Sequence, residues 1–342
     1  MQSDYEEIII HTKKTYPVLI CDACKEVESR IPSNSIIITD SNLMHYYHNA
    51  LEKYQCIVIP AGEESKQWKS LEIIFGELVR MNAGRDTFLL GFGGGVVLDI
   101  TGFVASTYKR GCRFGFVATS LLAQVDASVG GKNGINFGGY KNLVGVFNQP
   151  EFVVCDGSLL ATLPRIDFIN GMAEVIKHAL IADSNFYDYL VMQAPLILQL
   201  DKYSINHIVE SSVQIKSGYV IGDEYDQGLR HHLNFGHTFG HAFELSENIG
   251  HGYAVAKGMM VAAEISFRMK LCNRQLVEKT KQILLVYNLP VDFTINQEVM
   301  NSVMNDKKNR SGKISMVLIK GIGETIMVDF ELDELKKIAE QL

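Results

Sequence analysis

The feature that most restricts the fold of this chain is an alternation, through residues 1–157, of short apolar runs with longer helical patterns. The runs are rich in β-branched residues and predict strands over 36–39, 56–59, 87–91, 113–118 and 152–155. The intervening segments predict helices over 43–54, 66–81, 97–108 and 121–129. Strands joined by crossover helices form a mainly parallel sheet, so we expect an α/β domain whose ligands bind at the carboxyl ends of its strands.

From about residue 163 the pattern changes to one helix after another. Helices are expected over 169–183, 205–220, 237–248, 254–271 and 278–287. Two short alternating runs, 313–320 and 324–330, predict a late hairpin before a short terminal helix. A length of 342 residues suits two domains, which we place at 1–157 and 158–342, the second mainly α-helical.

Composition and charge exclude several classes of protein. The chain has 39 acidic and 32 basic residues and no run of lysine or arginine, so a nucleic-acid partner is not expected. Its first residues, MQSDYEEIII, are acidic where a signal peptide is basic, and no stretch of 18 residues is free of charge or glycine clusters. We therefore expect a cytoplasmic protein without a membrane partner.

The cysteines favour reduced thiols. Six cysteines are scattered over a long chain, which does not suit a disulfide framework. Cys21 and Cys24 form one C-x-x-C, but zinc would need a second pair and redox chemistry would need a thioredoxin context.

Glycine is concentrated in two windows. Thirteen of the 29 glycines lie between Gly91 and Gly145, and eight more lie between Gly218 and Gly258. A linker would mix glycine with polar residues, whereas these windows mix it with Val, Leu, Phe, Asp, Lys and His. Such clustering indicates backbone held close to ligands.

The first window opens with TFLLGFGGGVVLD, residues 87–99, an apolar strand running through a glycine turn into a helix. Such a turn lets a pyrophosphate approach backbone N–H groups at the positive end of a helix. The spacing is not G-x-G-x-x-G, because Val96 stands at the third glycine position. This motif alone is compatible with either a nucleotide-binding site or a close-packed structural turn.

Charged residues within apolar, glycine-rich sequence follow at 119–142. Asp126, Lys132 and Lys141 are costly to bury unless they pair with each other or with a charged ligand. A solvated loop is the alternative, although such loops seldom carry so many apolar residues.

Five of the ten histidines lie within 21 residues, at positions 231, 232, 237, 241 and 251. His237 and His241 have i, i+4 spacing and share a helix face, and a third histidine with Glu174 would complete a divalent-metal site. His178 competes, because it too is four residues from Glu174, and structural histidines are the alternative. By themselves, Glu174 and Lys177 would form an ordinary helical ion pair. The charge run at 306–310 is normally a solvated turn, but it could equally supply cations to an anionic substrate.

Taken together, these motifs resemble those of the 3-dehydroquinate synthase family. The resemblance runs from about residue 40 to residue 308 and rests on GGGVVLD, LLAQVDASVGGK, GGYKN, GMAEVIKH, LNFGHTFGH and HGYAVAKG. It implies a Rossmann-like domain for NAD over 1–157, followed by a helical metal- and substrate-binding domain over 158–342.

The resemblance also assigns residues to each ligand. NAD is expected at Asp40, Asn42, Glu63, Lys66, Gly94, Gly95, Asp99, Thr119, Ser120, Lys132, Lys141 and Thr162. A metal ion, zinc with cobalt as an alternative, is expected at Glu174, His237 and His251, which decides against His178. Catalytic roles are implied for Lys132, Lys177, Arg230, Asn234 and His241, and substrate contacts for Arg110, Asp126, Asn142, Lys216, Lys307 and Lys308.

The family's reaction converts 3-deoxy-D-arabino-heptulosonate 7-phosphate to 3-dehydroquinate and phosphate, a carbon–oxygen lyase step of the shikimate pathway toward aromatic amino acids. It combines NAD-dependent oxidation, phosphate elimination, re-reduction and intramolecular aldol closure, so NAD is regenerated in each turnover. The resemblance further implies a homodimer in which Arg110 reaches the partner's site.

The chain departs from the family pattern at four positions. Leu98 stands where glycine is usual, Asn133 where threonine is usual, Tyr253 where glutamate is usual, and Lys257 where an apolar residue is usual. Leu98 bears most on function, because a side chain near the pyrophosphate turn would weaken NAD binding unless it faces the sheet.

Related enzymes and proteins remain as alternatives. Deoxy-inosose synthases tend to carry glutamate at the Asn234 position and to lack Arg230, and valiolone-type cyclases tend to have HTFSP where this chain has HTFGH. An amino-substrate cyclase stays open. Glycerol dehydrogenase-like metal-dependent oxidoreductases would accumulate NADH, and a non-catalytic descendant would not need all three metal ligands.

Overall fold

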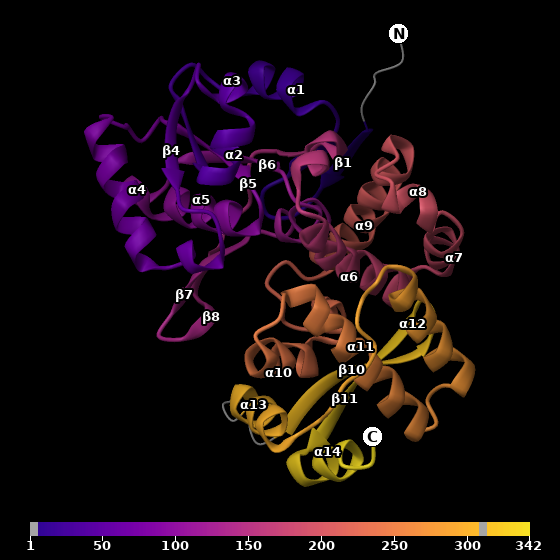
Figure 1. Cartoon of the computed structure of the whole chain (residues 1–342). Helices are drawn as coiled ribbons and strands as arrows, with labels where there is room; N and C mark the ends of the chain where they lie inside the picture. The colour runs from indigo at the N-terminus through magenta and orange to yellow at the C-terminus, as the bar shows by residue number, and fades with distance from the viewer. Residues whose placement is uncertain (1–5, 308–312) are drawn as a thin grey trace. The chain divides into compact units, whose positions relative to one another are not determined.

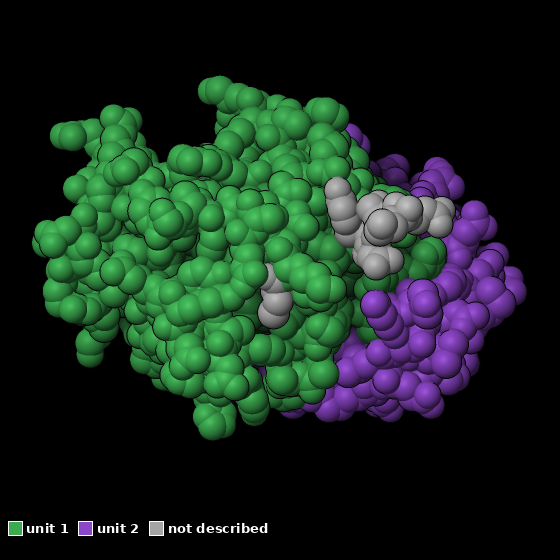
Figure 2. Space-filling model, turned by 90° about the horizontal axis from the view of Figure 1, so that it is seen from above, with its two compact units in different colours: residues 1–164, 205–225 green, residues 165–204, 226–342 purple. Residues whose placement is uncertain are grey.

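The computed structural model describes residues 6–307 and 313–342, and the chain divides into two compact units (Figure 2). One unit comprises Met1–Pro164 and Ile205–Tyr225, and the other Arg165–Ser204 and Asp226–Leu342. The boundary expected at 157/158 thus lies at 164/165. The assignment of NAD to 1–157 and of metal and substrate to 158–342 stays a prediction.

Residues 205–225 belong to the first unit for identifiable reasons. The carboxylate of Glu224 accepts hydrogen bonds from the Lys13 backbone N–H and from Gln149 Nε2, both at 3.0 Å. A Cβ atom on Gly157 would lie 2.8 Å from Ile205, so this segment packs directly on the first unit. These contacts link residues far apart in the chain, so they could not be predicted from local periodicity.

The first unit is built on a seven-stranded sheet with the order β1-β2-β9-β6-β5-β3-β4. Its strands are β1 (Glu6–Ile10), β2 (Tyr16–Ile20), β3 (Ser35–Asp40), β4 (Gln55–Ile59), β5 (Phe88–Gly93), β6 (Arg113–Ala118) and β9 (Val153–Cys155). All neighbours are parallel except β1 and β2. The mainly parallel sheet and its five expected strands are confirmed, whereas the antiparallel β1–β2 pair was not predicted.

The sheet has a point where its connections diverge. From β3 the chain runs to β4 on one side, whereas β5, β6 and β9 follow each other toward the other side. Ligands of parallel sheets bind beyond the carboxyl ends of the strands at such a point. Asp40 ends β3 and Gly93 ends β5, so both lie at this edge.

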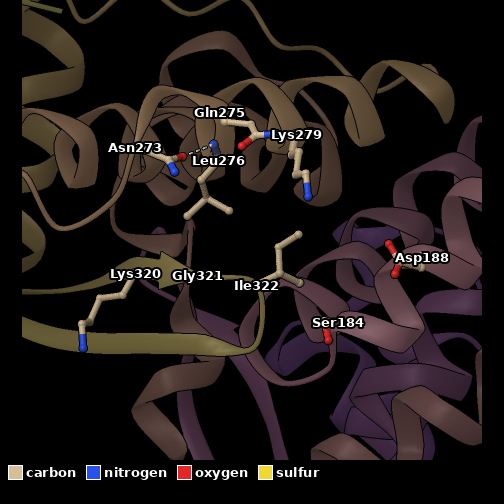
Figure 3. Close-up of a pocket in the computed structure, with 9 residues that line it drawn as sticks. All are labelled: Ser184, Asp188, Asn273, Gln275, Leu276, Lys279, Lys320, Gly321 and Ile322. Carbon is tan, nitrogen blue, oxygen red and sulfur yellow. Dashed lines mark hydrogen bonds between the residues drawn. The ribbon is translucent and has the colours of Figure 1, made fainter.

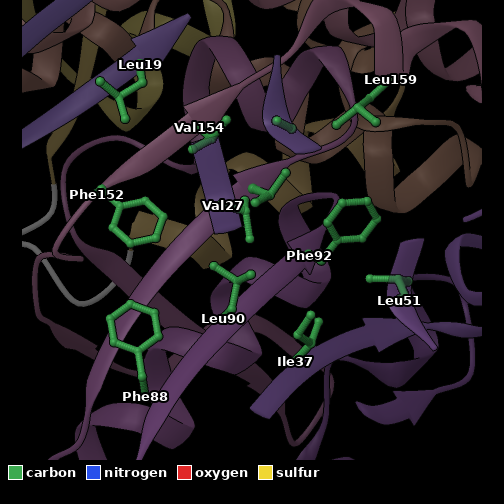
Figure 4. Packing of buried hydrophobic residues seen from close by; sticks show 12 residues of the cluster. Leu19, Val27, Ile37, Leu51, Phe88, Leu90, Phe92, Phe152, Val154 and Leu159 are labelled. Carbon is green, nitrogen blue, oxygen red and sulfur yellow. The ribbon is translucent and has the colours of Figure 1, made fainter. Parts of the chain in front are cut away.

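One hydrophobic cluster of the first unit lies on one face of this sheet (Figure 4). Phe88, Leu90 and Phe92 alternate along β5 and so share that face, which Val27 of α1 (Ala23–Arg30) covers. The opposite face carries α5 (Gly95–Thr107), whose Leu98 approaches β5. Burial on both faces explains why the strands are continuous apolar runs rather than alternating ones.

The remaining elements of the first unit differ in part from expectation. The helix expected over 43–54 is two short helices, α2 (Ser41–Tyr46) and α3 (His48–Leu51), because Tyr47 has non-helical backbone angles. Helix α4 (Trp68–Arg80) is confirmed, and the expected helix 121–129 contains a π-helical turn at Ala123–Ala127. Most of α9 (Lys202–Gly222) also lies here.

Part of the glycine-rich sequence forms an antiparallel hairpin that was not predicted. It consists of β7 (Lys132–Phe137) and β8 (Tyr140–Phe147). Gly134 and Gly145 face each other across it, and a Cβ atom on either would lie within 2.8 Å of the opposite backbone. These glycines therefore allow a close backbone approach, which an alternating apolar pattern would not reveal.

The second unit is mainly helical, as expected (Figure 1). Its elements are α6 (Arg165–Ala182), α7 (Ser184–Met192), α8 (Ala194–Leu198), α10 (His237–Glu247), α11 (His251–Arg268), α12 (Arg274–Val286), α13 (Gln297–Lys307), β10 (Lys313–Gly321), β11 (Glu324–Glu331) and α14 (Leu332–Ala339). The late hairpin and four expected helices are confirmed, whereas α7, α8 and α13 were not predicted. Helix α11 begins at residue 251 rather than 254, and it packs against α6 and α10.

Candidate functional site

Three predicted metal ligands of the second unit lie together. Glu174 comes from the middle of α6, whereas His237 and His251 are the first residues of α10 and α11. Glu174 Oε1 lies 3.5 Å from His237 Nε2 and 3.4 Å from His251 Nε2. One ligand atom from each residue lies within 4.8 Å of the others, which is the spacing that a single metal ion requires.

The outer nitrogen of each histidine has a partner that orients its ring. His237 Nδ1 lies 3.2 Å from the carbonyl oxygen of Phe235, and His251 Nδ1 lies 3.3 Å from Glu244 Oε2. Both acceptors favour a proton on Nδ1, so Nε2 is the nitrogen that faces Glu174 and is available to a metal ion once it is unprotonated. Metal-binding histidines are held in this way.

The Glu174 carboxylate fits a metal ligand better than a structural side chain. The residue is fully buried, and its carboxylate lies against the Lys177 ammonium and the two histidines. Because burying a carboxylate is costly unless cations surround it, a metal ion among these residues would stabilise it further.

Charges in this cluster set the protonation of its members. Burial by itself raises the pKa of Glu174, but Lys177 and the two histidines lower that pKa well below its ordinary value. Burial lowers the pKa of His237 to about 3. Burial also lowers the pKa of His251, but hydrogen bonds with Glu174 and Glu244 raise it to about 10. An ionised Glu174 and a neutral His237 are ready ligands, whereas His251 releases a proton when a metal binds.

Other predicted catalytic residues lie around these ligands. The rings of His237 and His241 are 5.4 Å apart, and those of His241 and His251 are 6.2 Å apart, with His241 exposed. Arg230 and Asn234 stand on one short 3-10 helix, Leu229–Asn234, where Arg230 is buried and Asn234 exposed. Hence His241 is placed beside the ligand histidines and is open to an incoming molecule.

In the first unit, the glycine turn at Gly94 and Gly95 leaves the backbone accessible to a ligand. Gly94 is the N-terminal cap of α5 and Gly95 its first residue, so their N–H groups lie at the positive end of that helix. A Cβ atom on Gly94 would lie 3.3 Å from Ser120 Oγ, and one on Gly95 would lie 3.3 Å from Ala127. Thr119, directly after β6, donates its backbone N–H to the carbonyl oxygen of Gly93. The turn is thus bounded by the Thr119–Ser120 segment.

Several predicted NAD contacts form one polar network. Lys66 is buried, forms an ion pair with Asp99 and donates to Asn142 Oδ1 at 2.5 Å. Burial raises the pKa of Asp99, an effect that the Lys66 ammonium opposes. Asn136 joins the network by donating to Glu63 Oε1 at 2.7 Å and by accepting the Asn142 N–H at 2.9 Å. Asn142, expected at the substrate, here contacts residues expected at NAD.

The other predicted NAD residues have local roles. Asp40 caps α2 by accepting the backbone N–H groups of Asn42 and Leu43 at 2.9 and 3.0 Å. The hydroxyls of Thr162 and Tyr47 lie 2.9 Å apart. These two hydrogen bonds already give the Asp40 carboxylate donors within the protein. A contact with a nucleotide would be additional to this capping role.

Predicted substrate contacts of the first unit fall into two groups. Lys216 Nζ donates to the Asp126 backbone oxygen at 2.5 Å and lies 2.6 Å from its Oδ1, although the two are 90 residues apart. Arg110 is an exposed cation, as are Lys132, which was expected in catalysis and at NAD, and Lys141, which was expected at NAD. The side chain of Lys307 and the whole of Lys308 lie outside the described residues.

The four departures from the family pattern have structural explanations in part. Leu98 is buried and faces β5, where a Cβ atom on Gly91 would lie 3.2 Å from it. Asn133 is buried and donates to the carbonyl oxygens of residues 131 and 148, both at 2.9 Å. Lys257 pairs with Glu247 and lies over the ring of residue 243. Nothing in the structure explains Tyr253.

Three residues near the candidate ligands were missed by the sequence analysis: Asn136, Asn170 and Glu244. Glu244 carried a signal, because it is seven residues after His237 and so shares its helix face. Asn170 carried the same kind of signal, four residues before Glu174. Asn136 carried none, because its partners lie in other elements.

A pocket of about 310 Å³ lies elsewhere in the second unit (Figure 3). Its lining comes from α7, α12 and the β10–β11 turn and comprises Ser184, Asp188, Asn273, Gln275, Leu276, Lys279, Lys320, Gly321 and Ile322. Apart from Leu276 and the turn residues, this lining is polar and exposed. It contains none of the predicted site residues.

Within residues 6–307 and 313–342, every helix is too short or too polar to cross a bilayer.

Two family models match most of the chain. Residues 56–170 match the model described as 3-dehydroquinate synthase N-terminal, and residues 171–309 match the model described as 3-dehydroquinate synthase C-terminal. Among curated relatives, the 3-dehydroquinate synthase of Psychrobacter arcticus is 36% identical over 366 residues, covering 98% of this chain and 94% of the relative.

Solved structures share the fold over nearly the whole chain. A 2-epi-5-epi-valiolone synthase from Streptomyces hygroscopicus subsp. jinggangensis, with NAD+ and Zn2+ bound, matches with a TM-score of 0.87 and 25% identity, covering 98% of this chain and 99% of that one. A 2-deoxy-scyllo-inosose synthase, complexed with carbaglucose-6-phosphate, NAD+ and Co2+, matches with a TM-score of 0.83 and 24% identity, covering 98% and 99%.

Proposed function

The chain belongs to the 3-dehydroquinate synthase family, and on this premise we propose that it converts 3-deoxy-D-arabino-heptulosonate 7-phosphate to 3-dehydroquinate and phosphate. The observation that carries the proposal is the joining of Glu174, His237 and His251 in a chain that matches both halves of the family. The enzyme would be a carbon–oxygen lyase of the shikimate pathway.

The cofactors of this reaction are NAD and one divalent metal ion, zinc or cobalt. When bound, NAD takes up and returns a hydride, and the metal ion lowers the pKa of a coordinated hydroxyl. The donor set of one carboxylate and two imidazoles suits zinc and leaves positions open for substrate oxygens. NAD would lie against the glycine turn and the polar network, at Asp40, Asn42, Glu63, Lys66, Gly94, Gly95, Asp99, Thr119, Ser120, Lys132, Lys141 and Thr162.

The chain's cations would bind the two anionic groups of the substrate. Arginine suits bidentate contact with a carboxylate, and lysine supplies a point charge for a phosphate. The residues with this role would be Arg110, Lys177, Lys216, Arg230, Lys307 and Lys308, with Asp126, Asn142 and Asn234 holding hydroxyl groups. Lys216 and Lys177 are each held by a carboxylate, so their ammonium groups are already oriented.

His241 would move protons at the reacting end of the substrate. Its ring is exposed, and it lies beside both ligand histidines, so it can reach a substrate oxygen held near them. Lys132, exposed at the start of β7, would be the second group in this role.

The decisive experiment is a substrate panel. Purified protein with NAD+ and zinc should release one phosphate from the heptulosonate phosphate and form dehydroquinate. Glucose 6-phosphate and sedoheptulose 7-phosphate should give no phosphate, because neither carries the carboxylate that Arg230 would bind. Phosphate release from either sugar phosphate, but none from the heptulosonate, would overturn the assignment in favour of a related cyclase. An amino analogue of the substrate completes the panel.

We further propose that the enzyme is a cytoplasmic homodimer in which Arg110 reaches the partner's site. Arg110 is exposed on a segment with positive φ angles, so its side chain is available to another chain. Light scattering should give a mass of about twice that of the 38.2 kDa chain. A monomer at assay concentration with full activity would contradict this part of the proposal.

A further inference from the structure

The two ligand histidines are oriented by chemically different groups. Behind His237 stands a neutral backbone carbonyl, that of Phe235, at 3.2 Å. Behind His251 stands a carboxylate, Glu244 Oε2, at 3.3 Å. A carboxylate strengthens the donor power of a metal-binding imidazole more than a carbonyl does. The two histidines are therefore unequal ligands.

Glu244 contacts His251 from the neighbouring helix. It lies on α10, two turns after His237, and its side chain is 8% exposed. Its carboxylate contacts His251 Nδ1, whereas Nε2 of the same ring faces Glu174. The carboxylate thus joins α10 to the first residue of α11.

The first turn of α11 is held to α6 by a second side chain. Gly250, the N-terminal cap of α11, has no side chain that can cap the helix. Asn170 Oδ1 instead accepts the Gly252 N–H at 2.6 Å, as a capping residue would. A Cβ atom on Gly252 would lie 1.9 Å from the Asn170 backbone oxygen, so α11 approaches α6 as closely as a glycine allows.

The position of Asn170 on α6 gives this contact a consequence for the ligands. Asn170 and Glu174 are four residues apart and share a helix face. Asn170 holds Gly252, the neighbour of His251, while Glu174 faces His251 itself. One face of α6 therefore sets both the carboxylate ligand and the helix end that carries an imidazole ligand.

We propose that Glu244 and Asn170 are positioning residues for His251: Glu244 orients its ring from behind, and Asn170 holds the helix end that bears it. The inference rests on the proposed function, because it assumes that Glu174, His237 and His251 bind the metal ion. It adds two residues that determine how tightly and in what geometry the ion is held.

The test measures metal binding by the metal-free protein, without NAD or substrate. Zn2+ affinity is obtained by competition with a chromophoric chelator, and Co2+ binding is followed by its visible absorption spectrum, which reports coordination geometry. Glu244→Ala should weaken Zn2+ binding by about 10- to 100-fold and change the Co2+ spectrum. Asn170→Ala should act in the same direction.

Conservative variants separate positioning from folding. Asn170→Asp keeps the acceptor for the Gly252 N–H and should recover most of the affinity that Asn170→Ala loses. Glu244→Gln keeps an acceptor but removes the charge, so its affinity should fall between those of the wild type and Glu244→Ala. Thermal unfolding of each metal-free variant verifies that it is folded. If an alanine variant does not fold, Asn170→Asp and Glu244→Gln are used in its place.

Glu247→Gln is the matched control. Glu247 lies on the same helix and pairs with Lys257 rather than with a ligand histidine. It should bind Zn2+ as the wild type does. Equal losses in Glu247→Gln and Glu244→Gln would overturn the inference, because general charge would then explain both. Unchanged affinity and spectrum in Glu244→Ala and Asn170→Ala would also overturn it. A wild type that binds no metal would instead refute the metal site of the proposed function.

Discussion

Leu98 shows how the surroundings of a single residue decide the meaning of a substitution. Its position follows the glycine turn, where a side chain could obstruct a pyrophosphate. In the structure Leu98 is 1% exposed and points at β5, where Gly91 leaves room for it. The side chain therefore belongs to the core between α5 and the sheet.

Leu98→Ala tests this assignment. The substitution should lower the free energy of unfolding by about 3 kcal/mol, because it leaves a cavity under α5. The affinity for NAD+ should change by less than about threefold, because the turn at Gly94 and Gly95 keeps its N–H groups. Urea unfolding and NAD+ titration measure the two quantities. A tenfold gain in NAD+ affinity would instead place Leu98 at the cofactor.

Cys21 illustrates how surroundings remove reactivity. Burial, together with the nearby Glu26 and Asp156, raises the pKa of Cys21 to about 12. Alkylation requires the thiolate, and with this pKa only about one thiol in ten thousand is ionised at pH 8. We expect iodoacetamide to label Cys21 at least about 100-fold more slowly than a cysteine in a short peptide, and faster as the pH rises.

Mass spectrometry of timed samples measures this labelling, with the fully buried Cys155 as an internal comparison. Labelling of Cys21 at the rate of the peptide would restore a redox or metal role for the C-x-x-C.

At the scale of elements, the metal ligands depend on where helices begin. His237 and His251 are the first residues of α10 and α11, and Glu174 lies inside α6, so three helices must meet for the ligands to meet. Glycines allow that meeting. A Cβ atom on Gly258 of α11 would lie 1.9 Å from the Gly236 backbone oxygen, and one on Gly252 as close to α6.

Gly252→Ala should therefore disturb the ligands through the helices. The added methyl group has no space against α6, so we expect a loss of about 1–3 kcal/mol in stability and weaker Zn2+ binding. Gly76→Ala is the control, because Gly76 lies in α4 with nothing within 4 Å of its Cβ position. That change should stabilise the protein by about 0.5–1 kcal/mol and leave Zn2+ binding unaltered. Normal metal affinity in Gly252→Ala would refute this coupling.

At the scale of the whole molecule, each unit carries a different part of the chemistry. The first unit contains the glycine turn and the Lys66 network, and the second contains the three candidate metal ligands. The same combination of a nucleotide unit and a metal unit would serve a dehydrogenase. The difference lies in whether the hydride returns to the substrate.

The proposed reaction returns it, so NADH should not accumulate. In the presence of zinc, NAD+ and excess heptulosonate phosphate, the NADH concentration, followed by absorbance, should stay below the enzyme concentration. The phosphate concentration should meanwhile rise through many turnovers. Removing the metal ion with a chelator should stop phosphate release, and adding zinc should restore it. Stoichiometric NADH with no phosphate would indicate a glycerol dehydrogenase-like reaction instead.

Most of the fold could be predicted, because its strands and helices leave local patterns. The runs at 36–39, 56–59 and 113–118 became β3, β4 and β6 within a residue of their expected bounds. The β7–β8 hairpin was missed, because its register depends on glycines that face each other across two strands. The edge pair β1–β2 and the helices α7, α8 and α13 were missed as well.

The α/β class, the change to a helical second half, and the candidate ligand types at residues 174, 237 and 251 follow from the order of amino acids. Periodicity and motif spacing are properties of neighbouring residues, so they can be read along the chain. Three further features depend on packing: residues 205–225 join the first unit, Leu98 faces the sheet, and Glu244 and Asn170 reach the end of α11. The reason is physical: those contacts depend on how closely helices and strands pack, which is set by side chains far apart in the sequence.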